Sequence, residues 1–425
     1  MDNITHSLTG LAAGEWLHRS IPPENSEQSQ QTRRNLLLLT FCLASNFPDL
    51  DLFLTPLLSE PLGYLLHHRG HTHTFLFLIP QALLLGGILF ASWKSARKLI
   101  LSSATTRLAF LGSLLIGLGL HIGMDFLNSY GVHPFFPIDN HWYYGDSVFI
   151  IEPILWTLFG APFFTSIKQK LVRQLLFLTL IASPLLFYMA GYLLGPISWL
   201  MTIVGLTLGW LQSKDRNDGS RAFNIAFASA LLFLFTQAGL SSWAKKEVDQ
   251  SIRAQDQSTA RIVDSAMTPF PSNPFCWSYA TLYQTKNDDQ KAVNEIRSYR
   301  LQKGVLSMSP DWLPASQCPR KLWPATDPLP ENSSTARLVF IESKIDLTRL
   351  ILEKENNCHF NAWLRFARIP IIQDDRASDL RFQRVGTRDN FTNLDLIKSK
   401  AHPCYSNVPN WSYPRRDLFF PTIPH

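Results

Sequence analysis

Histidine and carboxylate side chains gather in the first part of this 425-residue chain. Nine of the twelve histidines precede residue 142, and most carboxylates of residues 1–243 stand near them. Imidazole and carboxylate together suit zinc, manganese or iron. The pattern therefore predicts a divalent-metal site, with zinc the first choice and manganese or iron the alternatives.

The spacing of these residues allows several of them to point the same way. His121, Asp125 and Asn128 stand at i, i+4 and i+7, and so share one helix face. Asp49 and Asp51 flank a single residue in a segment that we expect to be extended or turning, so both carboxylates can face one cavity. Three carboxylates and one imidazole can therefore point toward a common site.

A run of four histidines supplies the further imidazoles. It reads H-H-R-G-H-T-H-T over residues 67–74, where Gly70 lets the backbone bend tightly. We expect His68, His73, His121 and Asp125 to be ligands. The remaining histidines of this region are expected to be lining or loop residues: His67, His71, His133 and His141. For any one of these side chains, the alternative to metal binding is a hydrogen bond at the membrane interface or a contact with a lipid headgroup. Side chains in such roles would not all lie on one membrane face.

The elements that must position these residues are membrane helices. Residues 1–243 hold 27 charged side chains and the remaining 182 residues hold 45, which excludes a purely soluble enzyme. The charge-poor part contains apolar runs near the 20 or so residues that cross a bilayer. The expected spans are 35–56, 74–93, 108–127, 149–167, 174–194, 196–211 and 222–243, while 4–18 is marginal in length.

The basic loops predict the orientation, because Lys and Arg near span ends prefer the cytoplasm. Alternate loops carry nearly all basic residues of the membrane half: 19–34, 94–107, 168–173 and 212–221. Only Arg69 lies on the other side. This places the metal-like cluster and everything after residue 243 on the outer face of a bacterial inner membrane protein with several spans. The net charge of +6 forms no dense basic block, so we expect no nucleic-acid partner.

The C-terminal part has the composition of a water-soluble domain. We expect a mainly α protein: a polytopic helical membrane bundle (1–243), a polar helical linker (244–268) and a small extracytoplasmic α+β domain (269–425). The strand candidates are 275–284, 336–342, 362–371, 379–385 and 417–422, and the helix candidates are 288–300 and 344–355. The domain carries no catalytic motif, so a lid or partner-binding module is favoured over a second active site.

Four of the five cysteines lie in this outer domain, and the fifth, Cys42, lies in a span. An oxidising compartment allows at least one disulfide, against the alternative of four separate buried thiols. Three pairings stay open. They would join Cys276, Cys318, Cys358 and Cys404.

The order of motifs over residues 1–155 resembles a known family. A histidine near the N-terminus, P-D-L-D, H-R-G-x-T-H-T and then G-L-x-x-H-x-x-x-D-x-x-N are similar to the LexA-regulated, membrane-bound metal-dependent hydrolases of the YdjM/YbcI type. Thr74 and Asn128 depart from the residues common there but keep polar groups. The tail motifs N-P-F-C-W (273–277) and D-L-R-F (379–382) are similar to the longer members only. The resemblance implies seven metal-site residues: His6, Asp49, Asp51, His68, His73, His121 and Asp125.

These observations favour a metal-dependent hydrolase whose site opens at the outer leaflet. Asp146 or Glu152 is the expected general base. Arg69 has a planar fork that suits phosphate, which favours a phosphoester or lipid headgroup as substrate. The alternatives are an ion or proton transporter or metal-sensing membrane protein, and a scaffold for the outer domain.

Overall fold

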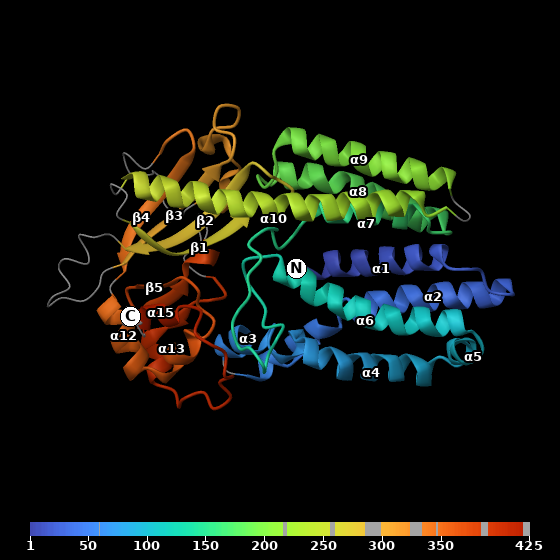
Figure 1. Cartoon of the computed structure of the whole chain (residues 1–425), viewed down its shortest axis with the longest axis horizontal. Coiled ribbons are helices and arrows are strands. Elements are labelled where there is room, and N and C mark those ends of the chain that lie inside the picture. The colour runs from blue at the N-terminus through green and yellow to red at the C-terminus, as the bar shows by residue number, and fades with distance from the viewer. Residues whose placement is uncertain are drawn as a thin grey trace.

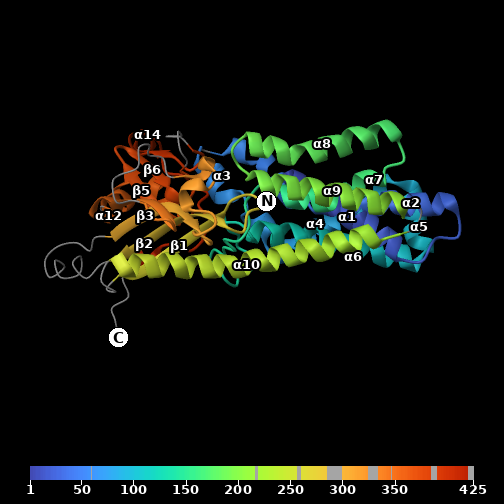
Figure 2. The same cartoon turned by 90° about the horizontal axis from the view of Figure 1, so that it is seen from above.

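The computed structural model describes residues 1–58, 60–215, 219–255, 260–284, 299–323, 334–345, 347–383 and 390–419. Within these ranges a bundle of long helices carries a smaller part with two sheets at one end (Figure 1). The last bundle helix, α10 (Arg221–Gln255), runs on from the bundle along the first sheet (Figures 1 and 2). This confirms the predicted class, a helical bundle followed by a small α+β part.

The other bundle helices are α1 (Asn3–Ser20), α2 (Glu27–Ala44), α4 (Phe75–Ser92), α5 (Lys94–Ser102), α6 (Ala104–Phe126), α7 (Pro153–Thr165), α8 (Lys170–Met189) and α9 (Gly195–Lys214). Short helical turns connect α2 to α4: η1 (Phe47–Phe53), η2 (Thr55–Leu57), α3 (Leu62–His67) and η3 (His71–His73). Side-chain caps fix several helix starts, because a side-chain oxygen accepts an otherwise unpaired N–H there. Thr74 caps α4 in this way, directly after the histidine run.

Four described helices are long and apolar enough to cross a membrane: α4, α6, α8 and α10. A fifth span is formed if α2 and the 3₁₀ segment Phe47–Leu57 count as one, bent by 50° at the break. The expected spans 149–167 and 196–211 are helices, but α7 is shorter than a span and α9 is not among these candidates.

Helix α1, the marginal segment, is a full helix because it packs tightly on α2. A Cβ atom at Gly10 would lie 2.7 Å from the carbonyl oxygen of Phe41, and one at Gly14 would lie 2.8 Å from that of Leu37. Glycine at these positions lets the two backbones approach closely. The packing brings His6, on the first turn of α1, to the end of α2, where Ser45 Oγ donates to its carbonyl.

The C-terminal part contains two antiparallel sheets. Strands β1 (Arg261–Pro269), β2 (Cys276–Gln284), β3 (Tyr299–Ser307) and β4 (Leu338–Ile345) form the first in sequence order. Strands β5 (Pro370–Gln373), β6 (Arg376–Asp379) and β7 (Leu394–Asp395) form the second. The helices are α12 (Leu347–Asn356), α13 (Cys358–Trp363), α14 (Leu396–Lys400) and α15 (Arg416–Phe419), beside the 3₁₀ turns Ala315–Gln317, Arg320–Leu322 and Leu380–Phe382.

The predicted helical linker is only half correct. Helix α10 covers its first half, but Arg261–Pro269 is strand β1, so the folded part begins before residue 269. The polar composition of this segment suggested a helix, whereas Ala266 and Met267 are buried core residues and β1 pairs along its length with β2. Tertiary pairing overrides local composition here.

Some of the remaining predictions of strands and helices are confirmed and others are wrong. The strands expected at 275–284 and 336–342 and the helix at 344–355 are confirmed as β2, β4 and α12. The strands expected at 362–371, 379–385 and 417–422 are wrong over most of their described length, which consists of the end of α13 with the turns after it, the 3₁₀ turn Leu380–Phe382 and α15. The helix expected at 288–300 falls outside the described residues up to 298, and Tyr299 already belongs to β3.

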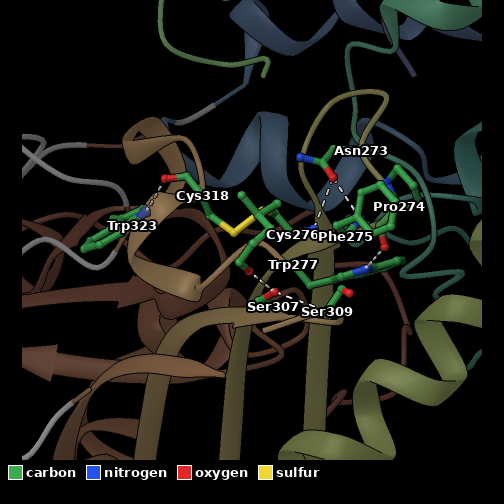
Figure 3. Close-up of a disulfide and its surroundings, with 10 residues drawn as sticks. Asn273, Pro274, Phe275, Cys276, Trp277, Ser307, Ser309, Cys318 and Trp323 are labelled. Carbon is green, nitrogen blue, oxygen red and sulfur yellow. Dashed lines mark hydrogen bonds between the residues drawn. A yellow bond between two sulfur atoms is a disulfide. The ribbon is translucent and has the colours of Figure 1, made fainter. Parts of the chain in front are cut away.

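Both cysteine pairs of the C-terminal part form disulfides, Cys276–Cys318 and Cys358–Cys404. Figure 3 shows the first beside the N-P-F-C-W motif, where Asn273 Oδ1 accepts from the backbone N–H groups of Phe275 and Cys276. The Cys276–Cys318 disulfide ties β2 to the turn that precedes Trp323. The indole of Trp323 donates to the carbonyl of Cys318. Cys42 is a free thiol.

Candidate metal centre

Three separate elements bring four ligand side chains together. Asp49 lies on η1, directly after the break that follows α2, and His73 ends η3. His121 and Asp125 lie one turn apart on the last turns of α6. All four side chains are buried, and charged or ligating groups at such depth are costly enough to indicate function.

The four ligand atoms converge on one point. His73 Nε2 lies 3.0 Å from His121 Nε2, 3.4 Å from Asp49 Oδ1 and 3.2 Å from Asp125 Oδ2. His121 Nε2 lies 3.4 Å from Asp49 Oδ1 and 3.6 Å from Asp125 Oδ2. A tetrahedron of nitrogen and oxygen ligands about 2.0–2.1 Å from zinc has edges of about 3.3 Å. The spacing therefore fits a small divalent ion.

The hydrogen bonding of the same atoms also fits a cation. Among the described residues, Asp49 Oδ1 and Asp125 Oδ2 are buried and accept no hydrogen bond, although the guanidinium of Arg69 lies 3.0 Å from Asp125 Oδ2. A buried carboxylate oxygen without a partner is expensive unless a cation satisfies it. Both of these oxygens belong to the converging set, and of the described carboxylates Arg69 pairs with Asp125 alone, so an ion between them is the simplest explanation for Asp49.

Neighbouring groups hold the two imidazoles with Nε2 turned inward. His121 Nδ1 lies 2.7 Å from the carbonyl oxygen of Ser45, which can only accept, so Nδ1 carries the proton. His73 Nδ1 lies 2.9 Å from the hydroxyl of Thr72. Such partners fix the tautomer and ring orientation of metal-binding histidines.

Asp51 and His68 extend the centre. Asp49, Asp51 and His68 form a second group whose ligand atoms lie within 4.8 Å of one another, so Asp49 is shared by both groups. Asp51 Oδ1 lies 3.0 Å from His68 Nδ1, and its Oδ2 accepts from Thr72 Oγ1 at 2.7 Å. The arrangement can hold one ion in the first group with Asp51 as an orienting carboxylate, or two ions bridged by Asp49.

His6, the remaining expected ligand, lies beside the first group without belonging to it. Its Nε2 is 3.3 Å from Asp125 Oδ1, and its ring stacks on His121 at 4.0 Å. The amino group of Met1 also contacts Asp125 Oδ1. His6 therefore positions Asp125 and His121, and the structure brings all seven expected metal-site residues to one place.

Arg69 also joins the cluster, as expected from the sequence. It is buried, its Nε lies 3.0 Å from Asp125 Oδ2, and its Nη1 donates to Asn128 Oδ1 at 3.1 Å. Its guanidinium covers the ring of Tyr130 at 4.5 Å. Arg69 has a φ of 60°, a conformation that costs a non-glycine residue energy and that clusters at functional sites.

The two carboxylates expected to act as general base are held elsewhere. Asp146 is paired with Arg368 and Lys245. Glu152 Oε1 accepts from Ser272 Oγ at 2.5 Å. Among the described residues neither carboxylate contacts the seven metal-site residues, so the contacts of Asp146 and Glu152 support roles in joining the C-terminal part to the bundle.

Some contributors to the centre were not predicted from the sequence. The hydroxyl of Thr72 contacts both Asp51 and His73, and the only signal for it is its place inside the histidine run. The carbonyl of Ser45 has no signal at all, since every residue carries one. Tyr64 and Tyr130 surround His68 and Arg69, and nothing in their spacing indicated this.

A cavity of about 130 Å³ lies next to the centre, between the bundle and the C-terminal part. Tyr64, Asn128 and Tyr130 line it from the bundle, and Arg381 and Phe391 line it from the C-terminal part. Arg381, from the D-L-R-F motif, pairs with Asp379 and donates to the carbonyl of Ser129 at 2.6 Å. The C-terminal part therefore forms one wall of the space beside the cluster.

Comparisons with known proteins match only the part of the chain that carries the cluster. No curated protein and no solved structure matches the chain. The profile of the YdjM inner membrane protein family matches residues 1–197, which include every residue of the cluster. The N-terminal part of this chain, which carries the seven candidate metal-site residues, is thus similar to the YdjM inner membrane protein family.

Proposed function

We propose that this protein is a membrane-embedded metal-dependent hydrolase. One observation carries the proposal: two imidazole nitrogens and two buried carboxylate oxygens, which accept no hydrogen bond from the described residues, converge at the spacing of a tetrahedral site. His73, His121, Asp49 and Asp125 would hold the ion, and zinc is the first candidate because its ligands are of this kind. Asp51 and His68 would orient Asp49 or complete a second site.

The bound ion would supply a Lewis acid and lower the pKa of a water molecule, which makes a nucleophile available at neutral pH. The chain supplies the rest. Arg69 is the cation that faces both Asp125 and the cavity-lining residue Asn128, so it can neutralise a phosphoryl oxygen that enters from the cavity. Asp51, which contacts His68 and Thr72, is the carboxylate placed to accept a proton beside the centre.

The exposed surface of η1, the segment that carries Asp49 and Asp51, supports a lipid as substrate. Asp49 and Asp51 point inward from η1, whereas Leu50, Phe53 and Leu54 of the same segment are exposed. Leu57 on η2 is 80% exposed. Exposed apolar side chains of this kind are expected against lipid tails, so the centre would lie at the level of the membrane surface. A phosphoester in a lipid headgroup is the substrate class that such a position favours.

The basic loops support an outward-facing site in a bacterial inner membrane. Ten of the 14 lysines and arginines of residues 1–243 lie on or beside the helix ends at one side of the bundle: Arg19, Arg33, Arg34, Lys94, Arg97, Lys98, Arg107, Lys168, Lys170 and Arg173. The cluster lies at the other end of α6, beside the C-terminal part. With basic loops on the cytoplasmic side, the centre and the C-terminal part would be extracytoplasmic.

Metal content tests the first half of this proposal. We expect detergent-purified protein to hold about one or two equivalents of zinc, manganese or iron by mass spectrometry. The double variant His73→Ala, His121→Ala should hold almost none. His141→Ala is the matched control, because it also removes an imidazole, but one that is 70% exposed and pairs with Asp139.

Hydrolysis tests the second half. Phosphatidic acid and phosphatidylglycerol in mixed micelles should release phosphate or headgroup, and a chelator should abolish the reaction. Arg69→Lys should lower kcat/KM by about 10-fold to 100-fold, because Lys keeps the charge but not the fork. Bound metal without hydrolysis of any phospholipid would instead support a metal-sensing or transporting protein, and protein without metal, even after metal is added, would refute both.

A further inference from the structure

A large pocket opens at the end of the bundle opposite to the metal centre. Its volume is about 880 Å³, within the roughly 300–1,000 Å³ of typical ligand sites. It lies where α1 ends, α2 begins and the loop from α7 leads into α8. Figure 1 shows these helix ends on the far side of the bundle from the sheets.

The lining of this pocket carries four basic side chains against two carboxylates. The basic ones come from two segments that are far apart in the sequence: Arg19 and Arg34 lie on α1 and α2, and Lys168 and Arg173 lie just before α8 and on its first turn. The preference of basic residues for the cytoplasmic side explains why both segments are basic. It does not require that they surround a common hollow.

A buried glutamate orients two of the arginines. Glu15 is 1% exposed, and its two oxygens accept from Arg19 Nε at 2.9 Å and from Arg34 Nε at 2.7 Å. Among the described residues, Nε is the only atom of the Arg34 guanidinium with a hydrogen bond, so both of its Nη groups are available to donate. Two parallel N–H groups are the geometry that binds phosphate oxygens.

The other two basic residues are tethered by single contacts. Lys168 Nζ donates to Gln31 Oε1 at 3.2 Å, and Arg173 Nη1 donates to the carbonyl of Ile167 at 3.1 Å. Each of them keeps further donors. The lining therefore presents several cationic donors held in place around one space.

Apolar groups adjoin the same space. Ile21, Pro23 and Ile167 are part of the lining. Helix α8, which begins beside it, is a candidate span with only 11% of its apolar window buried, and its first-turn Leu171 is 68% exposed. A molecule with a charged head in the pocket would thus have its apolar part against the lipid-facing side of α8.

We propose that this pocket binds a phosphate group, as carried by the headgroup of an anionic phospholipid. Basic pockets between membrane helices bind such headgroups. The site is separate from the metal centre, so it binds the phosphate without chemical change and stabilises the packing of α1 and α2 against α7 and α8. Free phosphate presents the same chemistry without the apolar part.

Lipid binding in native mass spectrometry tests the proposal. Phosphatidylglycerol, phosphatidylcholine and inorganic phosphate are added in turn to detergent-purified protein. We expect Arg34→Gln, Arg173→Gln to bind phosphatidylglycerol about 10-fold more weakly than the parent, which corresponds to 1.4 kcal/mol. The control Arg97→Gln, Lys98→Gln removes two charges from another basic segment, outside the pocket, and should bind as the parent does.

The outcomes separate the sources of the phosphate group. Binding of phosphatidylglycerol that millimolar inorganic phosphate does not displace supports a lipid, and displacement supports a site for free phosphate as well. An equal loss in the control, or no loss in the pocket variant, overturns the proposal. Lys168→Gln, at an exposed position, gives a second test if the double variant fails to fold. Metal content should stay unchanged in all of these variants.

Discussion

Arg368 and Asp146 form a buried ion pair with two hydrogen bonds, 2.8 Å from Nη1 to Oδ1 and 3.0 Å from Nη2 to Oδ2. Asp146 stands between α6 and α7 in the bundle, and Arg368 follows α13 in the C-terminal part. Asp264 on β1 accepts from the same guanidinium. Burial opposes the charge of Arg368, but the attraction of Asp146 and Asp264 outweighs it and raises the pKa of Arg368. This pair fixes the C-terminal part on the bundle, next to the metal centre.

Removal of one partner should therefore destabilise the joint between the two parts. Arg368→Leu leaves Asp146 buried with only Lys245, and we expect a loss of about 3–5 kcal/mol in the free energy of unfolding. Denaturant titration followed by tryptophan fluorescence measures it. Lys398→Gln, whose side chain is 83% exposed, is the control and should change stability by less than about 1 kcal/mol. A change in Arg368→Leu as small as in this control would contradict the assignment.

The sequence predicted the helices better than the strands. Helices α4 and α6 follow from apolar runs near the length of a span, where a window of composition is sufficient. Strand β3 was missed because it is buried on both faces, so its apolar and polar residues do not alternate. Lys303 within it reads as a surface residue, yet its amino group donates to the carbonyl of Leu380 in the core.

The convergence of the candidate metal-site residues could be predicted because spacing within one helix or turn fixes their direction. His121 and Asp125 are one helical turn apart, so they share a face wherever the helix lies. Asp146 and Glu152 resembled them in type and position. Their true partners, Arg368 and Ser272, lie 222 and 120 residues away, and no local pattern indicates such distant contacts.

Thr72 should tune metal affinity without being a ligand. Its hydroxyl donates to Asp51 Oδ2 and lies 2.9 Å from His73 Nδ1. We expect Thr72→Val to weaken zinc binding about 10-fold to 100-fold, because the ring of His73 loses its orienting partner. Thr72→Ser keeps the hydroxyl and should restore the affinity. Competition with a chromophoric chelator measures both, and parent-like binding by Thr72→Val would refute this role.

His133 should make the protein sensitive to acid. It lies between the rings of Trp142 and Trp411, at 3.7 and 4.1 Å, and burial lowers its pKa to about 3. In the unfolded chain the pKa is about 6.5. Between these values the unfolded chain binds more protons, so stability falls as the pH drops from about 6.5 towards 3, by at most about 1.4 kcal/mol per pH unit.

A variant isolates this contribution from that of other acids. His133→Phe keeps a planar ring between the two tryptophans but cannot bind a proton. Its unfolding free energy should depend less on pH than that of the parent between pH 6.5 and 4, as measured by denaturant titration at each pH. Identical slopes for the two proteins would show that His133 does not limit stability in acid.

The two disulfides give a test of the orientation that needs no purified protein. Disulfides persist in oxidising compartments, so an extracytoplasmic C-terminal part should have all four of its cysteines paired in the cell. When cells are quenched in acid and treated with a maleimide of high mass, we expect one labelled cysteine, Cys42, and five after reduction. The variant Cys42→Ser should then show no labelled cysteine before reduction and four after it.

Five labelled cysteines without reductant would place the C-terminal part in the cytoplasm. The proposed access of substrate from the outer leaflet would then fail, whereas the metal centre itself would be unaffected.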